Sequence, residues 1–454
     1  MSTVGIPNKD ISDTREPVRY TVKPGTQSRI VINTFPRAIC FLRVEGETNP
    51  KNSLKLYADK SGRTSFNYGP AKESDVIEKF VIDCDQGGRI TRFPVQLRVS
   101  SNPTPEMPAI PVESMRPPPE GTKVRPALSE EEMTNLSDAE LVKRGYLRRP
   151  DPKQTEHFNH WKKIVSRPTY IFEPEVVTDN EVRTAIPEGV QQIVSSTTTS
   201  YNWGGVVYQP GQPTDAPQIP NRWAAVTAWW VTPKVTGLTS VGSTDTNAKL
   251  LIWVGIDGWL TNTVFQGGTG HYVIQGANGP ATDDFLWYQY NPDDLPIGLT
   301  RVSLPPGVGP DDIVYVTVRT AAIFPDGSTI EDGNGYIDFI LSPTNGHDNW
   351  ITSITRGLAG RILGNTSAEW IAERPQFSGV FSNLANFGHI SINTSYASAY
   401  ADPDPDPTNY YPAEVITPCL MVNMINPNTG NTLSTTDPHI GKGGTIGVTW
   451  RNSS

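Results

Sequence analysis

From about Ser196 to the C-terminus, the sequence is a succession of short β-prone runs separated by turn residues. They include YNWGGVVY, WAAVTAWWV, KLLIWVGIDGW, FLWYQYNP and IVYVTVRTAAIF, with Gly, Pro, Asn and Asp between them. Roughly a dozen such runs in about 250 residues are typical of antiparallel sheets packed face to face. The sequence therefore predicts a two-sheet β-sandwich, or jelly roll, over residues 196–454.

Two further segments precede this sandwich. Alternating runs such as VRYTV, RIVINTF and KFVIDC predict a small β-sandwich accessory domain over residues 1–104. Residues 105–195 begin with a proline-rich stretch that cannot hold a regular ladder or helix, and continue with helical patterns that start near Ser129, Ser137 and Thr155. The expected fold class is thus all-β, with a short helical linker segment between its β domains.

Composition and charge narrow the classes of function. Residues 201–454 carry 10 of the 38 Lys and Arg and 21 of the 47 Asp and Glu, a net charge of −11, whereas residues 1–200 carry +2. Nucleic-acid binding needs clustered Lys and Arg, so we expect no nucleic-acid partner. The sequence shows no run of about 18 apolar residues and no signal peptide at its start, so we expect no membrane partner.

Residue types that bind metals or act as nucleophiles are sparse. Cys40, Cys84 and Cys419 have no metal-ligand spacing, although Cys40 and Cys84 could still join two strands. His157 and His160 lie one helical turn apart without a third ligand nearby, which favours a surface helix. The other histidines, His271 among them, fall mostly in polar turns and form no Ser/His/Asp spacing. We therefore expect no metal site and no cofactor.

An ordered set of motifs carries a resemblance to a known family. The set is NWGGVV at 202–207, VTP at 231–233, IWVGIDG at 252–258, VFQGG at 264–268, WYQYNP at 287–292 and SAEWIAE at 367–373. Their order and spacing are similar to those of the glutamic peptidases, also called eqolisins. Residues 134–165 also resemble the segment that precedes the catalytic domain in bacterial members of that family.

The resemblance implies a concanavalin-like sandwich with the activity of an acid-active endopeptidase. Its catalytic residues would be Gln266 and Glu373, the glutamate acting as general base and acid and the glutamine orienting water or stabilising the oxyanion. The polypeptide substrate would lie among the remaining motif residues, which are Trp203, Gly204, Gly205, Trp253, Asp257, Trp287 and Gln289. In a strand over 369–374, Glu369 and Glu373 share one face and Arg374 points to the other. Gln289 stands where the family has glutamate.

Two other classes of function remain open on the sequence. A tryptophan-lined sheet also suits a non-catalytic binding module for carbohydrate or protein, and ten of the 11 Trp lie after residue 200. A structural or surface-assembly protein is the other alternative. The charge asymmetry suggests the hypothesis that the basic segment 128–165 inhibits an acidic cleft within the same chain. The family resemblance implies secretion, although no signal peptide is visible.

Overall fold

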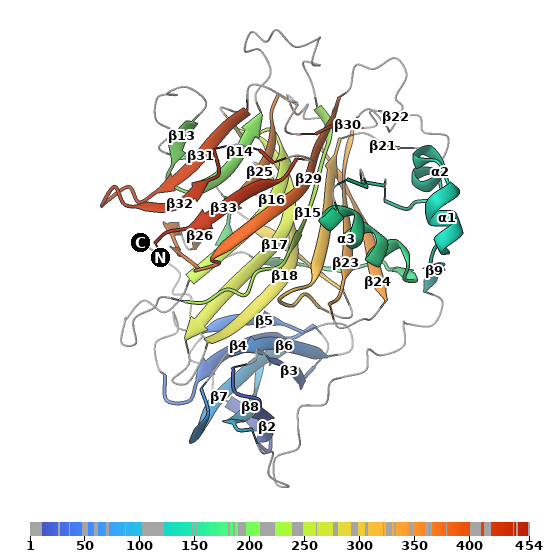
Figure 1. Ribbon diagram of the computed structural model, residues 1–454. Helices are drawn as coiled ribbons and strands as arrows, with labels where there is room; N and C mark the ends of the chain where they lie inside the picture. The colour runs from blue at the N-terminus through green and yellow to red at the C-terminus, as the bar shows by residue number, and fades with distance from the viewer. Residues whose placement is uncertain are drawn as a thin grey trace.

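The computed structural model of the protein describes most residues between Ile11 and Asn452 (Figure 1). The residues outside the description are 1–10, 26–27, 36, 48–52, 59–61, 70–71, 87, 102–121, 148, 151, 154, 180–181, 185–186, 189–196, 209–222, 238–247, 260, 276–279, 292–297, 305–306, 321, 324–328, 331–332, 345–347, 359–362, 364–365, 378, 400–409, 413–418, 439, 442–443 and 453–454. Most of the predicted proline-rich linker therefore lies outside the described residues.

Two large sheets form the C-terminal sandwich. The front sheet runs, in spatial order, through β13 (Thr197–Ser200), β31 (Cys419–Ile425), β14 (Trp203–Tyr208), β25 (Ala368–Glu373), β16 (Ala248–Ile256), β17 (Val264–Gln275), β18 (Pro280–Asn291), β19 (Leu299–Ser303) and β11 (Glu175–Asp179). The back sheet runs through β30 (Tyr410–Pro412), β29 (His389–Ala399), β15 (Trp223–Val231), β20 (Ile313–Arg319), β23 (Asn334–Ser342), β24 (Asn349–Gly357), β10 (Thr169–Ile171) and β9 (Lys123–Arg125).

Alternating apolar residues explain why these strands stack. Val206, Ile252, Phe265 and Trp370 of the front sheet pack against Phe339 and other back-sheet residues in one buried core between the sheets. Short strands complete the edges: β28 (Asn383–Leu384), β32 (Thr432–Thr436), β33 (Ile446–Trp450), and the isolated pair β21 (Ala322–Ile323) and β22 (Thr329–Ile330). The predicted all-β sandwich is confirmed.

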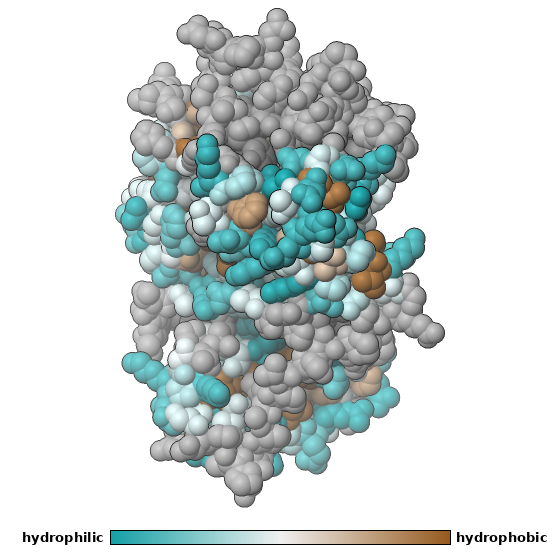
Figure 2. Space-filling view, turned by 45° about the vertical axis from the view of Figure 1, so that its right-hand side comes forward, coloured by the Kyte–Doolittle hydropathy of each residue, from teal (hydrophilic) through white to brown (hydrophobic). Residues whose placement is uncertain are grey.

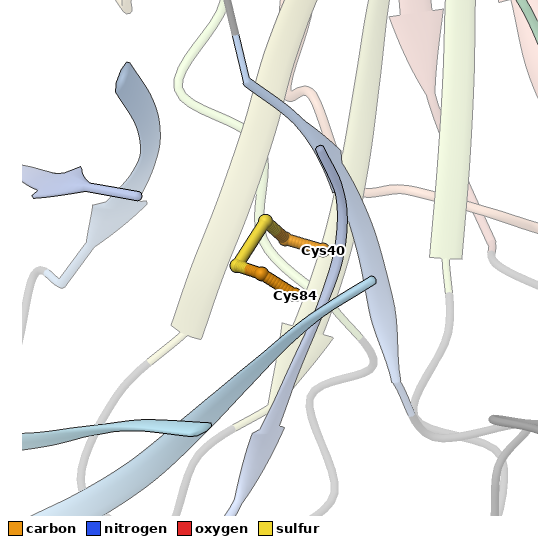
Figure 3. The surroundings of a disulfide bond; sticks show 2 residues. All are labelled: Cys40 and Cys84. Carbon is orange, nitrogen blue, oxygen red and sulfur yellow. A yellow bond between two sulfur atoms is a disulfide. The ribbon is translucent and has the colours of Figure 1, made fainter. Parts of the chain in front are cut away.

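The N-terminal strands form a small sheet and a hairpin below the sandwich (Figure 1). The sheet contains β1 (Ile11–Thr14), β2 (Val18–Val22), β8 (Arg89–Val99), β7 (Ser74–Gln86), β4 (Ile39–Val44) and β5 (Leu54–Tyr57). The hairpin of β3 (Ser28–Asn33) and β6 (Arg63–Tyr68) extends the front sheet, because β6 pairs with β18. A disulfide joins Cys40 and Cys84 across β4 and β7 (Figure 3).

Three short helices lie beside the back sheet (Figure 1). They are α1 (Glu130–Asn135), which begins with a capping box at Ser129, α2 (Asp138–Lys143) and α3 (Thr155–Val165). Ile164 packs against Trp229 and Tyr315 of the back sheet, and the ring of His160 meets Trp229 edge-on. None of the described helices is long and apolar enough to cross a membrane.

The surface beside these helices is mainly hydrophilic. Figure 2 shows hydrophobic areas that are small and separate on the face it displays. Exposed apolar side chains such as Val124 and Ile171 belong to the short strands β9 and β10. Helix α3 packs on the back sheet, and α1 and α2 pack against α3 in a cluster of their own. The hypothesis that segment 128–165 inhibits a cleft of the same chain stays a prediction.

Candidate functional site

The candidate site lies on the face of the front sheet that points away from the back sheet, which we call the outer face. Successive residues of a strand point to opposite faces, so every second residue of β14, β25, β16, β17 and β18 belongs to it. Trp203, Trp253 and Ile371 mark this face, because they pack in the cluster that also contains the N-terminal core and not in the core between the sheets.

Strand register places the glutamines and one glutamate in a single row across the outer face. Gln289 on β18 pairs with Gln266 on β17, Gln266 pairs with Gly255 on β16, and Gly255 pairs with Glu369 on β25. A Cβ atom at Gly255 would lie 3.2 Å from the Cβ of Gln266. The Trp253 ring comes still closer, at 2.8 Å from that Cβ position, so the glycine at 255 makes room for this ring beside the row.

Glu373 lies in a different row. It pairs with Leu251 on β16 and with Trp203 on β14, and its Oε2 accepts a hydrogen bond of 2.8 Å from the Trp253 indole. Leu251 and Gly255 are four residues apart on β16, or roughly 13 Å along the strand. The backbones of Gln266 and Glu373 are therefore offset along the sheet by about four residues. The catalytic pairing of Gln266 with Glu373 stays a prediction.

The remaining predicted site residues divide between the two faces. Trp287 and Trp253 share the row next to Gln266, through Gly268. Gly205 lies on the outer face in backbone contact with β25, whereas Gly204 faces inward, where a Cβ would meet the Ser434 hydroxyl at 2.4 Å. Trp203, Trp253 and Trp287, among which the substrate was expected to lie, are each fully buried.

Thr184, from the segment before the sandwich, contacts both glutamines. The Gln266 Nε2 donates a hydrogen bond to the Thr184 hydroxyl, and the hydroxyl donates to the Gln289 Oε1. The Thr184 backbone N–H also points at the Gln289 Oε1, at 3.3 Å, and the Asn291 amide donates to the hydroxyl at 3.4 Å. The outer-face row is therefore covered by the chain itself, a contact that the sequence analysis missed.

Glu369 supplies the carboxyl of this row, and its pKa is strongly shifted. Burial raises its pKa well above the ordinary range, the Ser367 hydroxyl and the Trp259 backbone N–H oppose the rise, and the negative charge of Asp257 adds to it. The Ser367 and Trp259 contacts fall short of full hydrogen-bond geometry, since both carboxyl oxygens lack a partner among the described residues. Burial therefore dominates, and it favours the protonated form of Glu369.

This raised pKa predicts a pH dependence of stability. Folded Glu369 holds its proton more tightly than the unfolded chain, whose glutamate titrates near 4.5. Raising the pH from there toward the folded pKa therefore lowers the free energy of unfolding. Glu369→Gln cannot ionise, so we expect it to gain stability over the wild type as pH rises through this window. Denaturant unfolding at a series of pH values measures this, and a pH-independent difference would contradict it.

A second polar cluster lies between the two sheets. Thr269 Oγ1 is 3.0 Å from His271 Nε2, and His271 Nδ1 is 2.6 Å from Asp284 Oδ1. The prediction that His271 lies in a polar turn is wrong, because His271 lies within β17 and is fully buried. Trp230 donates to Thr269 at 3.0 Å, and Asn67 of β6 donates to Asp284 at 2.5 Å. The cluster therefore joins the N-terminal hairpin to the sandwich core, where substrate has no access.

The comparison with known protein families concerns the same strands that carry the outer-face rows. Residues 201–417 match the Peptidase A4 family. This Peptidase A4 match includes all of β14, β15, β16, β17, β18 and β25. It supports a peptidase hydrolase, whose substrate class is polypeptide. No curated protein matches the chain.

The Peptidase A4 match corrects two predictions. The motifs were assigned to the glutamic peptidases, whereas the family that matches over those residues is Peptidase A4. The family assignment was therefore wrong, and so was the acid-active glutamic mechanism that was inferred from it. The motifs could locate the sandwich strands and their buried face, but they could not define which residues of that face meet.

Proposed function

We propose that the front sheet holds the reaction centre of a peptidase, with Asp257 and Glu369 as a carboxyl pair and Gln266 and Gln289 as amides that bind the peptide. The observation that carries this proposal is the register, which aligns Gln289, Gln266, Gly255 and Glu369 across four neighbouring strands. Gly255 carries no side chain of its own, and the ring of Trp253 lies beside it in this row.

The two carboxyls suit the proton transfers of hydrolysis. One group must take a proton from water and another must give one to the leaving amine. Two interacting carboxyls hold different protonation states, because ionising one opposes ionising the other. Glu369, with its raised pKa, is the protonated member. Asp257 accepts hydrogen bonds from the Thr366 N–H at 2.7 Å and hydroxyl at 3.1 Å.

Digestion in isotope-labelled water tests this function. The full chain is incubated with a denatured protein in water enriched in oxygen-18, in buffers from acid to neutral pH, and the products are sequenced by mass spectrometry. We expect new internal C-termini that carry one labelled oxygen, since hydrolysis adds one water oxygen. A matched preparation with Gln266→Ala and Glu369→Gln together should yield none. Equal labelling by this double variant would reject the proposal, and so would the absence of labelled termini both from the wild type and from the Val182→Asp variant described below.

A further inference from the structure

Residues 182–184, which we call the strap, lie against the outer face where Gln266 and Gln289 meet. Strand β12 (Val182–Arg183) pairs antiparallel with β26 (Gln376–Phe377), the strand that follows β25, and β26 pairs with β27 (Val380–Phe381). Val182 is 0% exposed and Thr184 is 2% exposed. The strap is therefore packed onto the sheet as an extended segment paired with another strand.

Thr184 of the strap forms hydrogen bonds with only some of the polar atoms that surround it. Gln266 uses its Nε2 and Gln289 its Oε1 in the contacts with Thr184. Gln266 Oε1, Gln289 Nε2 and Asn291 Oδ1 have no partner among the described residues. A buried polar atom without a partner is unfavourable, because it has lost its hydrogen bonds to water. A peptide backbone presents both N–H donors and C=O acceptors, so a better aligned extended peptide would complete what Thr184 leaves unpaired.

Both flanks of the strap are anchored. Before it, Asp179 accepts a hydrogen bond of 3.2 Å from Arg301, which also pairs with Asp283 at 2.5 Å. After it, the Glu188 carboxylate accepts from Gln376 at 2.9 Å, and the Glu188 N–H donates to the Asn202 side chain at 2.9 Å. The nine residue steps from Asp179 to Glu188 reach at most about 30 Å, and the five strand spacings from β11 to β25 span about 24 Å. The anchors therefore keep the strap on the outer face.

We infer that the strap occupies the path of the substrate. The site takes an extended peptide that pairs antiparallel with β26 and places the hydroxyl of a Ser or Thr between Gln266 and Gln289. This inference rests on the proposed peptidase function, and it adds the form of the substrate and an internal inhibitor. Because Gln266, Gln289 and Glu369 are each at most 1% exposed, substrate enters only after the strap is displaced or cut.

A binding experiment tests the inference without relying on catalysis. The probe is a fluorescein-labelled synthetic peptide with the sequence of residues 179–188, and its anisotropy is followed with the full chain. Val182→Asp places a charge in a buried apolar position and should release the strap. Val176→Asp is the matched control, since Val176 on β11 is 49% exposed. Hydrogen exchange of the β26 amides shows whether the strap has left.

We expect Val182→Asp to bind the peptide about tenfold or more tightly than the wild type or Val176→Asp, because a tethered segment acts at millimolar effective concentration. Thr184→Val, which removes only the hydroxyl, should shift binding in the same direction by less. Adding Gln266→Ala and Gln289→Ala to Val182→Asp should remove the gain. Exposed β26 amides without peptide binding, or equal binding by Val176→Asp, would overturn the inference.

The same proteins separate this inference from the proposed function. If Val182→Asp binds the peptide but no protein produces labelled termini, the proposed binding path stands and the proposed peptidase function is rejected. If labelled termini form at equal rates with the wild type and with Val182→Asp, the proposed peptidase function stands and the strap is not an inhibitor.

Discussion

Glu369→Gln is expected to lower kcat/KM for peptide hydrolysis about 100-fold or more, in the range that general acid–base groups contribute. The amide that replaces the carboxyl has nearly the same shape but carries no transferable proton. Glu369 is fully buried in the row that contains Gln266, so its loss removes chemistry without opening the surface. Because folded Glu369 favours its neutral form, the substitution should not lower stability.

The effect should fall on kcat more than on KM. Gln266 and Gln289 keep their amides in this variant, so the peptide-binding groups remain. Steady-state kinetics on a fluorogenic peptide measure both constants, and a thermal unfolding curve checks the fold. If the variant retains more than a tenth of the wild-type kcat, Glu369 takes no part in the reaction.

Arg301→Met is expected to lower the free energy of unfolding at neutral pH by about 3–5 kcal/mol, because it leaves buried carboxylates without their counter-charge. Arg301 is 4% exposed, lies over the Phe285 ring at 3.7 Å and pairs with both Asp179 and Asp283. Burial raises the pKa of Asp283 and Arg301 opposes the rise. Protonation of Asp283 would relieve its unpaired charge, so the loss should be smaller at acid pH.

Arg319→Met is the matched control for this prediction. Like Arg301, Arg319 forms an ion pair with an aspartate, Asp338 at 2.9 Å, and lies over an aromatic ring, that of Tyr336. Unlike the Arg301 cluster, this pair is partly exposed, with side-chain exposures of 15% and 24%. Exposed pairs contribute about 0–1 kcal/mol. Denaturant unfolding of both variants measures the contrast. An Arg301→Met loss no larger than that of Arg319→Met would show that the buried cluster adds nothing to stability.

Alternation and turn residues in the sequence were enough to predict the sandwich. Runs such as KLLIWVGI are apolar on both faces, which fits β16, where every residue is buried. The union of the N-terminal hairpin with the front sheet was not predictable, because it depends on pairing between β6 and β18, far apart in the sequence. His271 was misplaced because adjacent glycines resemble a turn, although here they lie within a long strand.

The site was predictable as a face but not as a set of partners. Glu369 and Glu373 have the same strand parity, so the pattern of SAEWIAE places both on one face and cannot choose between them. The pairing of β25 with β16 and of β16 with β17 places Glu369 in the row of Gln266. This register depends on the whole sheet. The contacts of Thr184 could not be predicted from the sequence, since a single threonine outside any motif acquires its partners only in the folded structure.

In the peptidase that we propose, Glu369 and not Glu373 shares the reaction centre with Gln266. The most direct test compares kcat/KM for one peptide in Glu369→Gln and Glu373→Gln, two equivalent substitutions at fully buried positions of the same strand and face. We predict a loss of about 100-fold or more for Glu369→Gln and less than about tenfold for Glu373→Gln. The reverse order, or equal losses, would contradict the claim.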